Sequence, residues 1–569
     1  MSTNCRGASS RASGSTAMTM NNHQQSPVDH SDGDTASRGF GWTDGSTVEL
    51  QLNSQHTLPV SRHSERTSLD LHAPASSNGG NISLPDRHGR YVEGDLETRT
   101  LYEDDQNNLV SWSGDDDPEL PYNWPSWRIY TNAGVLTFLA FLIPLSSSII
   151  APGVPQVMEE FQNSSHELAA FVVSVFVLGS AFGPLLLSPL SEIYGRLIIY
   201  HIANVGFVAF NLACALAPSL EALIAFRFFA GFFGSCPITN GGASIADLVP
   251  PEKRGAFMAG FAVGPLLGPV IGPVIAGFLA DARGWRWIFW LVVIISGLMS
   301  VVMFLVGRET YAPILLQRKV DRLKKSTGNP NLRQKLDNGL TPLGQIKRGI
   351  VRPMKLLFLS PIGLISALYL AVVYGYIYLM FSSVTEVFNQ QYGITGSISG
   401  LVYLGLGIGS LIGVLVTSIV TDRAVKKSTV DGKELKPEVR LQLTPVGGLF
   451  LPAGLFIYGW TAEYHVHWIA PILGMTVMGV GNVIMFMSIC LYLIDCFTIY
   501  SASALAANTV VRSIGGGLLP LAGLRMFSRL GVGWGNSLLG FIAAAMIPIP
   551  VLFLRYGEWL RKNFEVKDL

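Results

Sequence analysis

The stretch 264–277 reads GPLLGPVIGPVIAG and lies inside an apolar segment that runs from about residue 256 to residue 280. Three glycines recur every fourth residue in it, and each is followed by a proline: Gly264, Pro265, Gly268, Pro269, Gly272 and Pro273. A helix in water would not tolerate three such prolines, because each removes a backbone donor and clashes with the preceding turn. Membrane helices tolerate them, since neighbouring helices satisfy the freed carbonyl groups. Because glycines four apart share one face, the stretch predicts a kinked membrane helix that packs closely against another backbone.

The composition is also typical of a membrane protein. Of 569 residues, 49% are hydrophobic and only 14% are charged, whereas soluble domains carry about 25% charged residues. The net charge of +1 gives no overall field that would attract nucleic acid. The 5 cysteines form neither a CxxC pair nor a metal-binding spacing, so we expect no structural disulfide, metal ion or other cofactor.

Apolar segments near the ~20 residues needed to cross a bilayer follow one another through the rest of the chain. They predict an all-α membrane protein with twelve transmembrane helices at 129–151, 168–190, 197–217, 222–244, 256–280, 286–306, 357–381, 397–420, 442–462, 467–494, 500–524 and 534–555. A basic connector at 307–356 separates the first six from the last six. We therefore expect two six-helix bundles, at 128–306 and 357–556, and a short C-terminal tail at 557–569.

Residues 1–127 differ from the rest of the chain. They are rich in polar residues and show no helical or strand period, so we expect a disordered tail. They contain no apolar stretch typical of a secretory signal.

The placement of Lys and Arg predicts the orientation in the membrane. The loops at 152–167, 382–396 and 463–466 contain no Lys or Arg, whereas the connector and the loop after the eighth span are basic. The positive-inside rule therefore places both basic segments and both termini in the cytoplasm. The Asn163-Ser164-Ser165 sequon then lies outside, where Asn163 is a glycosylation acceptor.

The two halves repeat each other in outline. The second span ends in Ser191–Arg196 and the eighth in Thr421–Arg423, while Asp247 and Asp495 close the fourth and tenth spans. Such a repeat predicts pseudo-symmetric bundles related by an axis along the membrane normal, with the substrate site between them near the midplane.

At this point the chain resembles a known family. The sequences GPLLLSPLSEIYGR (183–196), RFFAG (227–231), the Gly-Pro ladder, GRETYAP (307–313) and YLIDCFTIYSASALAANTVVRS (492–513) are similar to those of major facilitator superfamily transporters. The branch they resemble is the fungal twelve-span drug:proton antiporter family, and the resemblance runs from about residue 124 to the C-terminus. It implies alternating access driven by an ion gradient.

The charges at the cytoplasmic ends of the spans suggest a gate. Glu192 and Arg196 lie four residues apart and are expected to pair with each other and with Asp247, with Arg254 nearby. The resemblance implies that this cluster latches the cytoplasmic ends of the two halves together in the outward-facing state. A weaker counterpart in the second half would comprise Asp422, Arg423 and Asp495. The alternative is ordinary charge on loops.

Two arginines fall inside predicted spans, where charge is costly and usually functional. The resemblance ties Arg227 to proton coupling; its alternative role is to bond carbonyl groups of a neighbouring helix or to reach the outer interface. Arg512 shares a helix face with Asn508, and this pair has either a structural or a substrate role. The first span contains no Asp or Glu, so the sequence names no proton carrier. The charge balance favours a neutral amphiphile or an anion as substrate over a polycation.

A cavity rich in aromatic residues is expected around the seventh and tenth spans. Its candidate lining residues are Tyr374, Tyr376, Tyr378, Phe381, Asn482 and Phe486. Helix packing or an interfacial aromatic belt is the alternative for each of them. The eighth span has its own glycine ridge, at Gly405, Gly409 and Gly413, which we expect to meet the ladder of the fifth span.

Together these features predict a transporter and not an enzyme. The expected function is proton-coupled efflux, by antiport, of a hydrophobic or amphiphilic small molecule, either a drug or toxin or a self-made secondary metabolite such as a glycolipid or organic acid. The alternatives are a proton-coupled nutrient uptake symporter and a non-transporting nutrient sensor. No GxxxxGK[ST] nucleotide loop is present. We expect a monomer in the plasma membrane, with the vacuolar membrane as the alternative, and the bilayer, protons and a small molecule as its partners.

Overall fold

A computed structural model describes residues 83–85, 91–93, 108–114, 116–337, 339–430 and 436–564. All of them belong to the compact unit Asn81–Leu569. Most of residues 1–107, for which the sequence predicts disorder, and the last part of the C-terminal tail lie outside the described residues.

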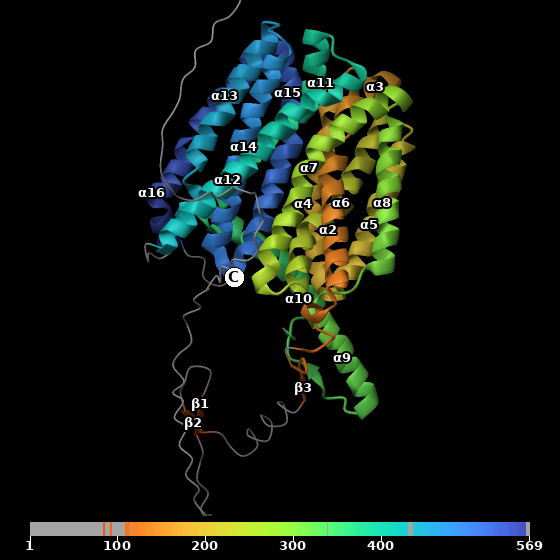
Figure 1. The fold of residues 1–569 in the computed structure, drawn as a ribbon, viewed down its shortest axis with the longest axis vertical. Helices are drawn as coiled ribbons and strands as arrows, with labels where there is room; N and C mark the ends of the chain where they lie inside the picture. Colours follow the sequence, from red (N-terminus) through yellow and green to blue (C-terminus); the bar gives the residue numbers. More distant parts are fainter. Residues whose placement is uncertain are drawn as a thin grey trace, which may run out of the picture. The chain divides into compact units, whose positions relative to one another are not determined.

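The described chain is almost entirely helical, as predicted (Figure 1). The spanning helices of the first half are α2 (Ser126–Ser148), α4 (His166–Tyr194), α5 (Arg196–Ala215), α6 (Leu220–Leu248), α7 (Pro251–Arg283) and α8 (Arg286–Val306). Those of the second half are α11 (Pro361–Tyr392), α12 (Leu404–Val430), α13 (Thr444–Glu463), α14 (Ile469–Phe497) and α15 (Ser501–Ala545), which α16 (Pro548–Asn563) continues.

Short elements join the spanning helices. The connector contains α9 (Ala312–Thr327) and α10 (Pro342–Leu359), and α3 (Val154–Glu160) follows α2. The remaining short turns are η1 (Pro121–Asn123), η2 (Ala151–Gly153), η3 (Gly396–Tyr403), η4 (Pro437–Leu441) and η5 (Thr498–Tyr500). Strands β1 (Ser83–Pro85) and β2 (Tyr91–Glu93) pair antiparallel, and β3 (Leu109–Val110) pairs in parallel with β4 (Arg333–Gln334). We call the end of the bundle that carries α9 and α10 the connector end, and the end that carries α3 the far end.

The eleventh and twelfth spans follow each other without a loop. Residues 501–563 form one apolar helical stretch of 63 residues, and it is the last of 11 such stretches in the described chain. At 1.5 Å per residue it would extend about three times the ~30 Å hydrocarbon thickness. The chain instead reverses at Gly531, whose φ of 77° breaks the helix. The stretch is therefore two spans, and the fold has the twelve predicted from the sequence.

The neighbours of this turn confirm the reversal. The carboxylate of Glu463, at the end of α13, accepts hydrogen bonds from the backbone N–H groups of Val532 (2.8 Å) and Gly533 (3.1 Å). Further along, Gly459 of α13 packs on Asn536, and Phe456 contacts Phe541 at 5.3 Å between ring centroids. The helix after Gly531 thus runs antiparallel to α13, back towards the connector end.

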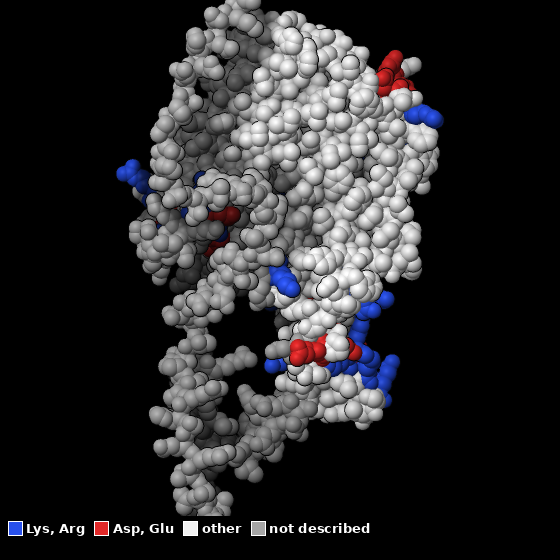
Figure 2. Space-filling view, viewed as in Figure 1, with Lys and Arg blue, Asp and Glu red and all other residues white. Residues whose placement is uncertain are grey.

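The outer surface of the spanning helices is apolar, as the bilayer requires. Phe304 and Leu305 of α8 are 75% and 69% exposed, and the face drawn in Figure 2 is almost free of charge along the spanning helices. Polar residues instead point inward, for example Ser174 of α4 and Asn211 of α5, which are both buried. The burial pattern is therefore that of a helix bundle in lipid.

Glycines allow the closest helix contacts, and they do so in the same way in both halves. A Cβ on Gly231 of α6 would meet the backbone oxygen of Phe176 in α4 at 1.9 Å. A Cβ on Gly409 of α12 would meet the backbone oxygen of Thr476 in α14 at 2.0 Å. The second and fourth spans therefore pack as the eighth and tenth do, which agrees with the predicted repeat.

The expected contact between the two glycine ridges is wrong. The ladder of α7 faces α2 of its own half: a Cβ on Gly268 would lie 2.7 Å from the backbone nitrogen of Leu145. The ridge of α12 faces α14, also in its own half. Spacing shows that glycines share a face, but it does not show which neighbour that face meets. α7 and α12 do touch, at other positions: a Cβ on Gly407 would meet Val270.

The last part of the N-terminal tail is ordered, contrary to the expectation of disorder up to residue 127. β3 pairs with β4 of the connector, and Lys335 donates its backbone N–H to the carbonyl of Val110 at 3.0 Å. Lys319 of α9 forms an ion pair with Asp117 at 2.8 Å. In Figure 2 acidic and basic side chains lie side by side at this end of the molecule. Because the partner charges lie some 200 residues away in sequence, composition alone could not predict the contact.

Candidate functional site

A small cavity of about 70 Å³ lies between the two halves. Both halves supply its walls, through α2, α4, α6, α11 and α15. Its lining consists of apolar side chains, hydroxyl groups and one charged residue: Ile143, Pro144, Ser147, Phe176, Val177, Ser180, Pro184, Ser235, Ile238, Thr239, Tyr374, Tyr378, Thr509, Arg512 and Ser513. Such walls suit an apolar molecule that carries a few polar groups.

Arg512 supplies the charge. Its guanidinium carbon lies 4.6 Å from the ring centroid of Tyr374 and 5.0 Å from that of Phe486, within the range of cation–π attraction. It takes part in none of the ion pairs formed among the described residues. One turn earlier, Asn508 is buried and its Oδ1 accepts no hydrogen bond within the described chain. The cavity wall thus presents a positive charge that no described carboxylate balances.

Arg227 is enclosed differently. It is 1% exposed, and its guanidinium donates to the carbonyls of Ser147 (2.9 Å), Ser146 (3.4 Å) and Val173 (3.4 Å). The rings of Phe176 and Phe289 cover it at 5.3 and 5.7 Å. This is the carbonyl-bonding arrangement that the sequence left open as the alternative for Arg227. The arginine of α6 therefore holds α2 and α4 together.

The predicted aromatic residues separate into two groups. Tyr374 and Tyr378 line the cavity, and the Tyr378 hydroxyl shares a 2.7 Å hydrogen bond with Ser147 of the other half. Tyr376 points elsewhere and donates to the carbonyl of Leu539 at 3.0 Å. The remaining predicted lining residues have structural contacts as well.

Asn482 and Phe381 make contacts away from the cavity lining, and Phe486 lies just behind it. Asn482 donates to the carbonyl of Val373 at 2.6 Å. Phe381 stacks on Tyr403 at 5.8 Å, and Phe486 lies against Arg512. The structure thus brings Tyr374, Tyr378 and Phe486 around Arg512, and leaves Tyr376, Phe381 and Asn482 in helix packing.

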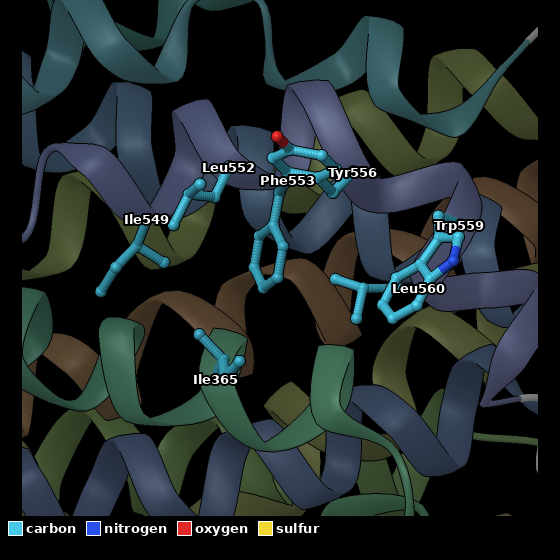
Figure 3. Close-up of a pocket in the computed structure, with 7 residues that line it drawn as sticks. All are labelled: Ile365, Ile549, Leu552, Phe553, Tyr556, Trp559 and Leu560. Atoms are coloured by element: carbon cyan, nitrogen blue, oxygen red, sulfur yellow. The ribbon is translucent and has the colours of Figure 1, made fainter.

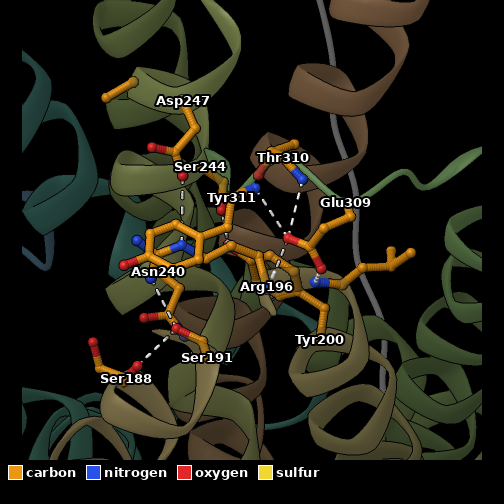
Figure 4. A network of polar contacts seen from close by, with 12 residues as sticks. Ser188, Ser191, Arg196, Tyr200, Asn240, Ser244, Asp247, Glu309, Thr310 and Tyr311 are labelled. Carbon is orange, nitrogen blue, oxygen red and sulfur yellow. Dashed lines mark hydrogen bonds and ion pairs between the residues drawn. The ribbon is translucent and has the colours of Figure 1, made fainter. Parts of the chain in front are cut away.

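At the connector end a second cluster joins α4, α5, α6 and the start of the connector (Figure 4). Arg196 pairs with Asp247 at 3.5 Å, donates to the Ser191 hydroxyl at 2.8 Å and lies 4.8 Å from the Tyr311 ring. The predicted partner Glu192 is instead exposed and forms none of the ion pairs found among the described residues. The reason is geometric, because the chain turns at Gly195, where φ is 103°.

Glu309 closes this cluster. Its buried carboxylate accepts backbone N–H groups of Arg196 (3.0 Å), Leu197 (3.2 Å), Thr310 (3.1 Å) and Tyr311 (3.0 Å). It therefore caps the N-terminus of α5, where backbone donors and the helix dipole favour a negative charge. Sequence reasoning quoted the GRETYAP motif but assigned no role to Glu309. An acid directly after the sixth span was the signal that could have identified it.

Arg254 lies beside this cluster without joining it. It donates to the carbonyl of Ala246 (3.0 Å) and to the Tyr122 hydroxyl (3.3 Å). Tyr122 in turn donates to the same carbonyl at 3.3 Å. Arg254 thus links the N-terminal segment to the end of α6.

The second half has its own ion pair at the connector end. Asp495 of α14 pairs with Arg440 of η4 at 2.7 Å. The predicted partners Asp422 and Arg423 are both exposed and take part in none of the described ion pairs. Arg440 is one of several basic residues in the loop after the eighth span, and the fold of η4 selects it as the partner of Asp495.

Two further features lie away from these clusters. Asn163 lies between α3 and α4 at the far end, and its Oδ1 accepts the backbone N–H of Ser165 at 2.8 Å. A larger hollow of about 540 Å³ lies between α11 and α16, with only apolar and aromatic residues around it (Figure 3). Trp559 and Leu552 on its rim are exposed. Because this hollow is not between the halves, the smaller cavity beside Arg512 is the better candidate substrate site.

The far end joins the two halves closely. Thr385 of α11 donates to the carbonyl of Ala151 at 3.5 Å, and the backbone N–H of Ser397 donates to Asp281 at 3.3 Å. A Cβ on Gly277 would meet the backbone nitrogen of Gly400 at 2.9 Å. In this conformation the halves therefore touch beyond the cavity, on the side away from the connector.

Comparison with known proteins identifies the family. The model of the Major Facilitator Superfamily matches residues 136–520. "MFS-type transporter tndD" of Aspergillus flavipes is 54% identical over 463 residues, covering 80% of this chain and 86% of that protein. "Efflux pump radE" of Floropilus chiversii is 50% identical over 464 residues, covering 81% of this chain and 86% of that protein. The chain belongs to the major facilitator superfamily.

Solved structures show the same fold. The crystal structure of a D-xylose-proton symporter aligns with a TM-score of 0.56 at 18% identity, covering 74% of this chain and 97% of that chain. A bacterial homologue of the human lysosomal transporter Spinster, in an inward-facing conformation, aligns with a TM-score of 0.57 at 15% identity, covering 78% and 100%. With the family match and the relatives named as transporters, the protein is a multi-pass membrane transporter of small molecules and not an enzyme.

Proposed function

We propose that this protein exports a hydrophobic or amphiphilic small molecule, a secondary metabolite of the cell or a toxin, in exchange for protons. The cavity beside Arg512 carries the proposal, because it lies between the halves and combines aromatic rings, hydroxyl groups and a cation. A neutral amphiphile or an anion fits these walls. A polycation does not, since it would meet the unbalanced charge of Arg512.

The export direction is supported by the relatives. A protein named as an efflux pump is 50% identical to this chain. The symporter among the solved structures is 18% identical and supports the fold alone. Export therefore remains the function that we propose.

Alternating access would use the contacts at the two ends. Closure at the far end, through Thr385 and Asp281, leaves the connector end as the side from which the substrate enters. We take the connector end as cytoplasmic, because its segments carry the basic residues. The gate that we propose there contains Arg196 and Asp247 in one half and Arg440 and Asp495 in the other. Each pair lies within its own half, and its side chains are at most about a quarter exposed, so the pairs fix the ends of the helices that would move in the cycle.

We propose that Arg227 contributes to the coupling of proton and substrate movement by holding neighbouring groups in position. It fixes the carbonyl of Ser147, whose hydroxyl meets Tyr378 of the opposite half. A conformational change at the cavity is thereby transmitted between the halves and to the buried guanidinium of Arg227. The Gly-Pro ladder supports the same motion, because Ser148 donates to the carbonyl of Pro269 (3.5 Å), which Pro273 leaves without its helical donor.

The gene deletion is the test. Metabolites in the medium and resistance to a drug panel are compared between the deletion strain and strains that carry the wild type or Arg512→Gln. Loss of one secreted product with unchanged resistance supports a dedicated exporter, and broad hypersensitivity supports a multidrug pump. Unchanged secretion and resistance together with reduced uptake of a nutrient would refute export. Substrate-driven proton release from inside-out vesicles tests antiport, and microscopy of a tagged protein tests plasma against vacuolar membrane.

A further inference from the structure

Ser113 lies where the N-terminal segment docks on the connector. Its hydroxyl accepts a hydrogen bond from the Lys319 ammonium at 3.0 Å, and the same ammonium binds Asp117 at 2.8 Å. The backbone N–H of Ser113 donates to Asp117 at 3.0 Å, which closes the turn. Ser113 itself is exposed. An accessible hydroxyl is thus held directly beside a cation on another element.

We call residues 108–120 the acidic strap. Besides the bonds at Lys319, Glu119 pairs with Arg322 of α9 at 2.9 Å, and β3 pairs with β4. Beyond the strap, Tyr122 continues to the carbonyl of Ala246, at the end of α6. The strap therefore ties the connector to the connector end of the first half, next to Asp247.

The charges on the two sides of this contact are unequal. Residues 108–120 contain four acidic residues and no basic one, whereas residues 312–335 contain seven basic residues and one acidic. The formal charges are therefore −4 and +6. A phosphate group carries about −1.5 to −2 charges at neutral pH and offers three strong acceptor oxygens. One phosphate on the strap would match the charge of the opposing segment.

The sequence around Ser113 has the pattern that such a modification needs. Ser113 is followed by Gly114 and then by three aspartates, 115–117. Kinases select substrates by charge complementarity, and a basic substrate groove favours acids that follow the acceptor serine. Ser111, two residues earlier, has a glycine at its third following position. The pattern thus separates two exposed serines of the same strap.

We propose that Ser113 is a phosphorylation site for an acid-directed serine kinase, and that its phosphate binds Lys319 and fastens the acidic strap to the connector. The inference rests on the cytoplasmic placement of the connector end, which forms part of the proposed function. Because Asp117 is buried in the docked strap, the kinase acts on the undocked strap. The phosphate then shifts the equilibrium towards docking, through charge-assisted hydrogen bonds.

The test uses the purified full-length protein, ATP and a kinase selective for serine followed by acidic residues. Phosphopeptide mass spectrometry should find phosphate on Ser113, and Ser113→Ala should remove it. Ser111→Ala is the matched control and should keep it. Hydrogen exchange of residues 109–120 should slow about fivefold to tenfold after phosphorylation. Lys319→Ala should abolish this slowing while increasing the rate of phosphorylation, because its strap is more often undocked.

Absence of phosphate from Ser113, or strap exchange that is unchanged or faster after phosphorylation, would overturn the proposal. The assay contains no transport step, so its outcome is independent of export. Mass spectrometry of protein isolated from cells tests whether the connector end is cytoplasmic. If Ser113 is modified in vitro but carries no phosphate in cells, the orientation is wrong and Ser113 is not a site that the cell uses.

Discussion

The carboxylate of Glu309 accepts the backbone N–H of Arg196 at 3.0 Å, although 113 residues separate them. The two residues belong to two of the sequence blocks quoted above, 183–196 between the second and third spans and 307–313 after the sixth. Glu309 thereby fixes the start of α5, while the Arg196 side chain remains directed at Asp247 and Tyr311. The backbone of the proposed gate is held rigid and its side chains are left to switch.

Glu309→Gln should destabilise the protein more than its loss of charge alone would suggest. The new amide NH₂ would face backbone donors that now bind a carboxylate, so buried N–H groups would lose their acceptors at a cost of about 1–3 kcal/mol. Thermal unfolding in detergent should show a lower midpoint. Glu221→Gln is the control, since Glu221 is exposed in the first turn of α6. Equal midpoints for both variants would contradict the capping role.

Arg512→Gln should reduce transport about tenfold to a hundredfold, the size expected when a contact to a charged group is lost, while the fold persists. Arg512 forms no described ion pair, so its removal leaves no carboxylate unpaired, whereas the cavity loses its charge. Transport and thermal unfolding of the same preparations measure the two effects. Arg529→Gln removes an exposed arginine of the same helix and should change neither. Normal transport by Arg512→Gln would exclude Arg512 from the substrate site.

The docking of the acidic strap should weaken in acid. Hydrogen bonding from Lys319, and from the backbone at Ser113 and Glu119, holds the pKa of Asp117 well below its usual range. A lowered pKa gives stability that is complete above the unfolded value, ~3.9, and is lost as the pH falls through the folded value. Hydrogen exchange of the strap should therefore be constant from pH 7 to about 5, after correction for the intrinsic rate, and rise below about 4. Asp117→Asn should show fast exchange already at pH 7, and a flat profile at the wild-type level in that variant would disprove the linkage.

Cysteine pairs distinguish the observed contact of α7 and α12 from the ridge contact expected from spacing. Val270→Cys with Gly407→Cys should cross-link on oxidation, because a Cβ on Gly407 lies 2.9 Å from the Cβ of Val270 and a small shift reaches disulfide geometry. Gly268→Cys with Gly409→Cys should not, since these residues face α2 and α14. Gel mobility after proteolysis in the connector reports the cross-link. The reverse outcome would restore the ridge contact.

The span positions could be predicted because each span must by itself supply about 20 apolar residues. The partner of the ladder could not, since Gly268 meets Leu145 only through the arrangement of α2. Arg196 was correctly associated with Asp247, because both lie at span ends in matching loops. Glu192 was assigned to the same cluster on spacing, but the turn at Gly195 places it and Arg196 on different helices, and Glu192 is exposed.

The sequence predicted which kinds of residue line the candidate cavity, but only some of the individual residues. Tyr374 and Tyr378 lie one turn apart and both line it, while Tyr376, between them, points to the opposite face of α11 and bonds Leu539. Arg227 and Arg512 looked equivalent in sequence. Two rings cover each of them, and the three carbonyls that Arg227 binds separate this structural arginine from Arg512, which lines the cavity.

The turn at Gly531, held by Glu463, also limits how the transporter can move. Because no loop joins the last two spans, the connection between them cannot lengthen. The far ends of these spans and of α13 must therefore move as one rigid unit. Opening at that end then has to occur where α11 and η3 meet the first half, through Thr385 and Ser397. The turn at Gly531 therefore determines on which side of the second half a substrate could leave.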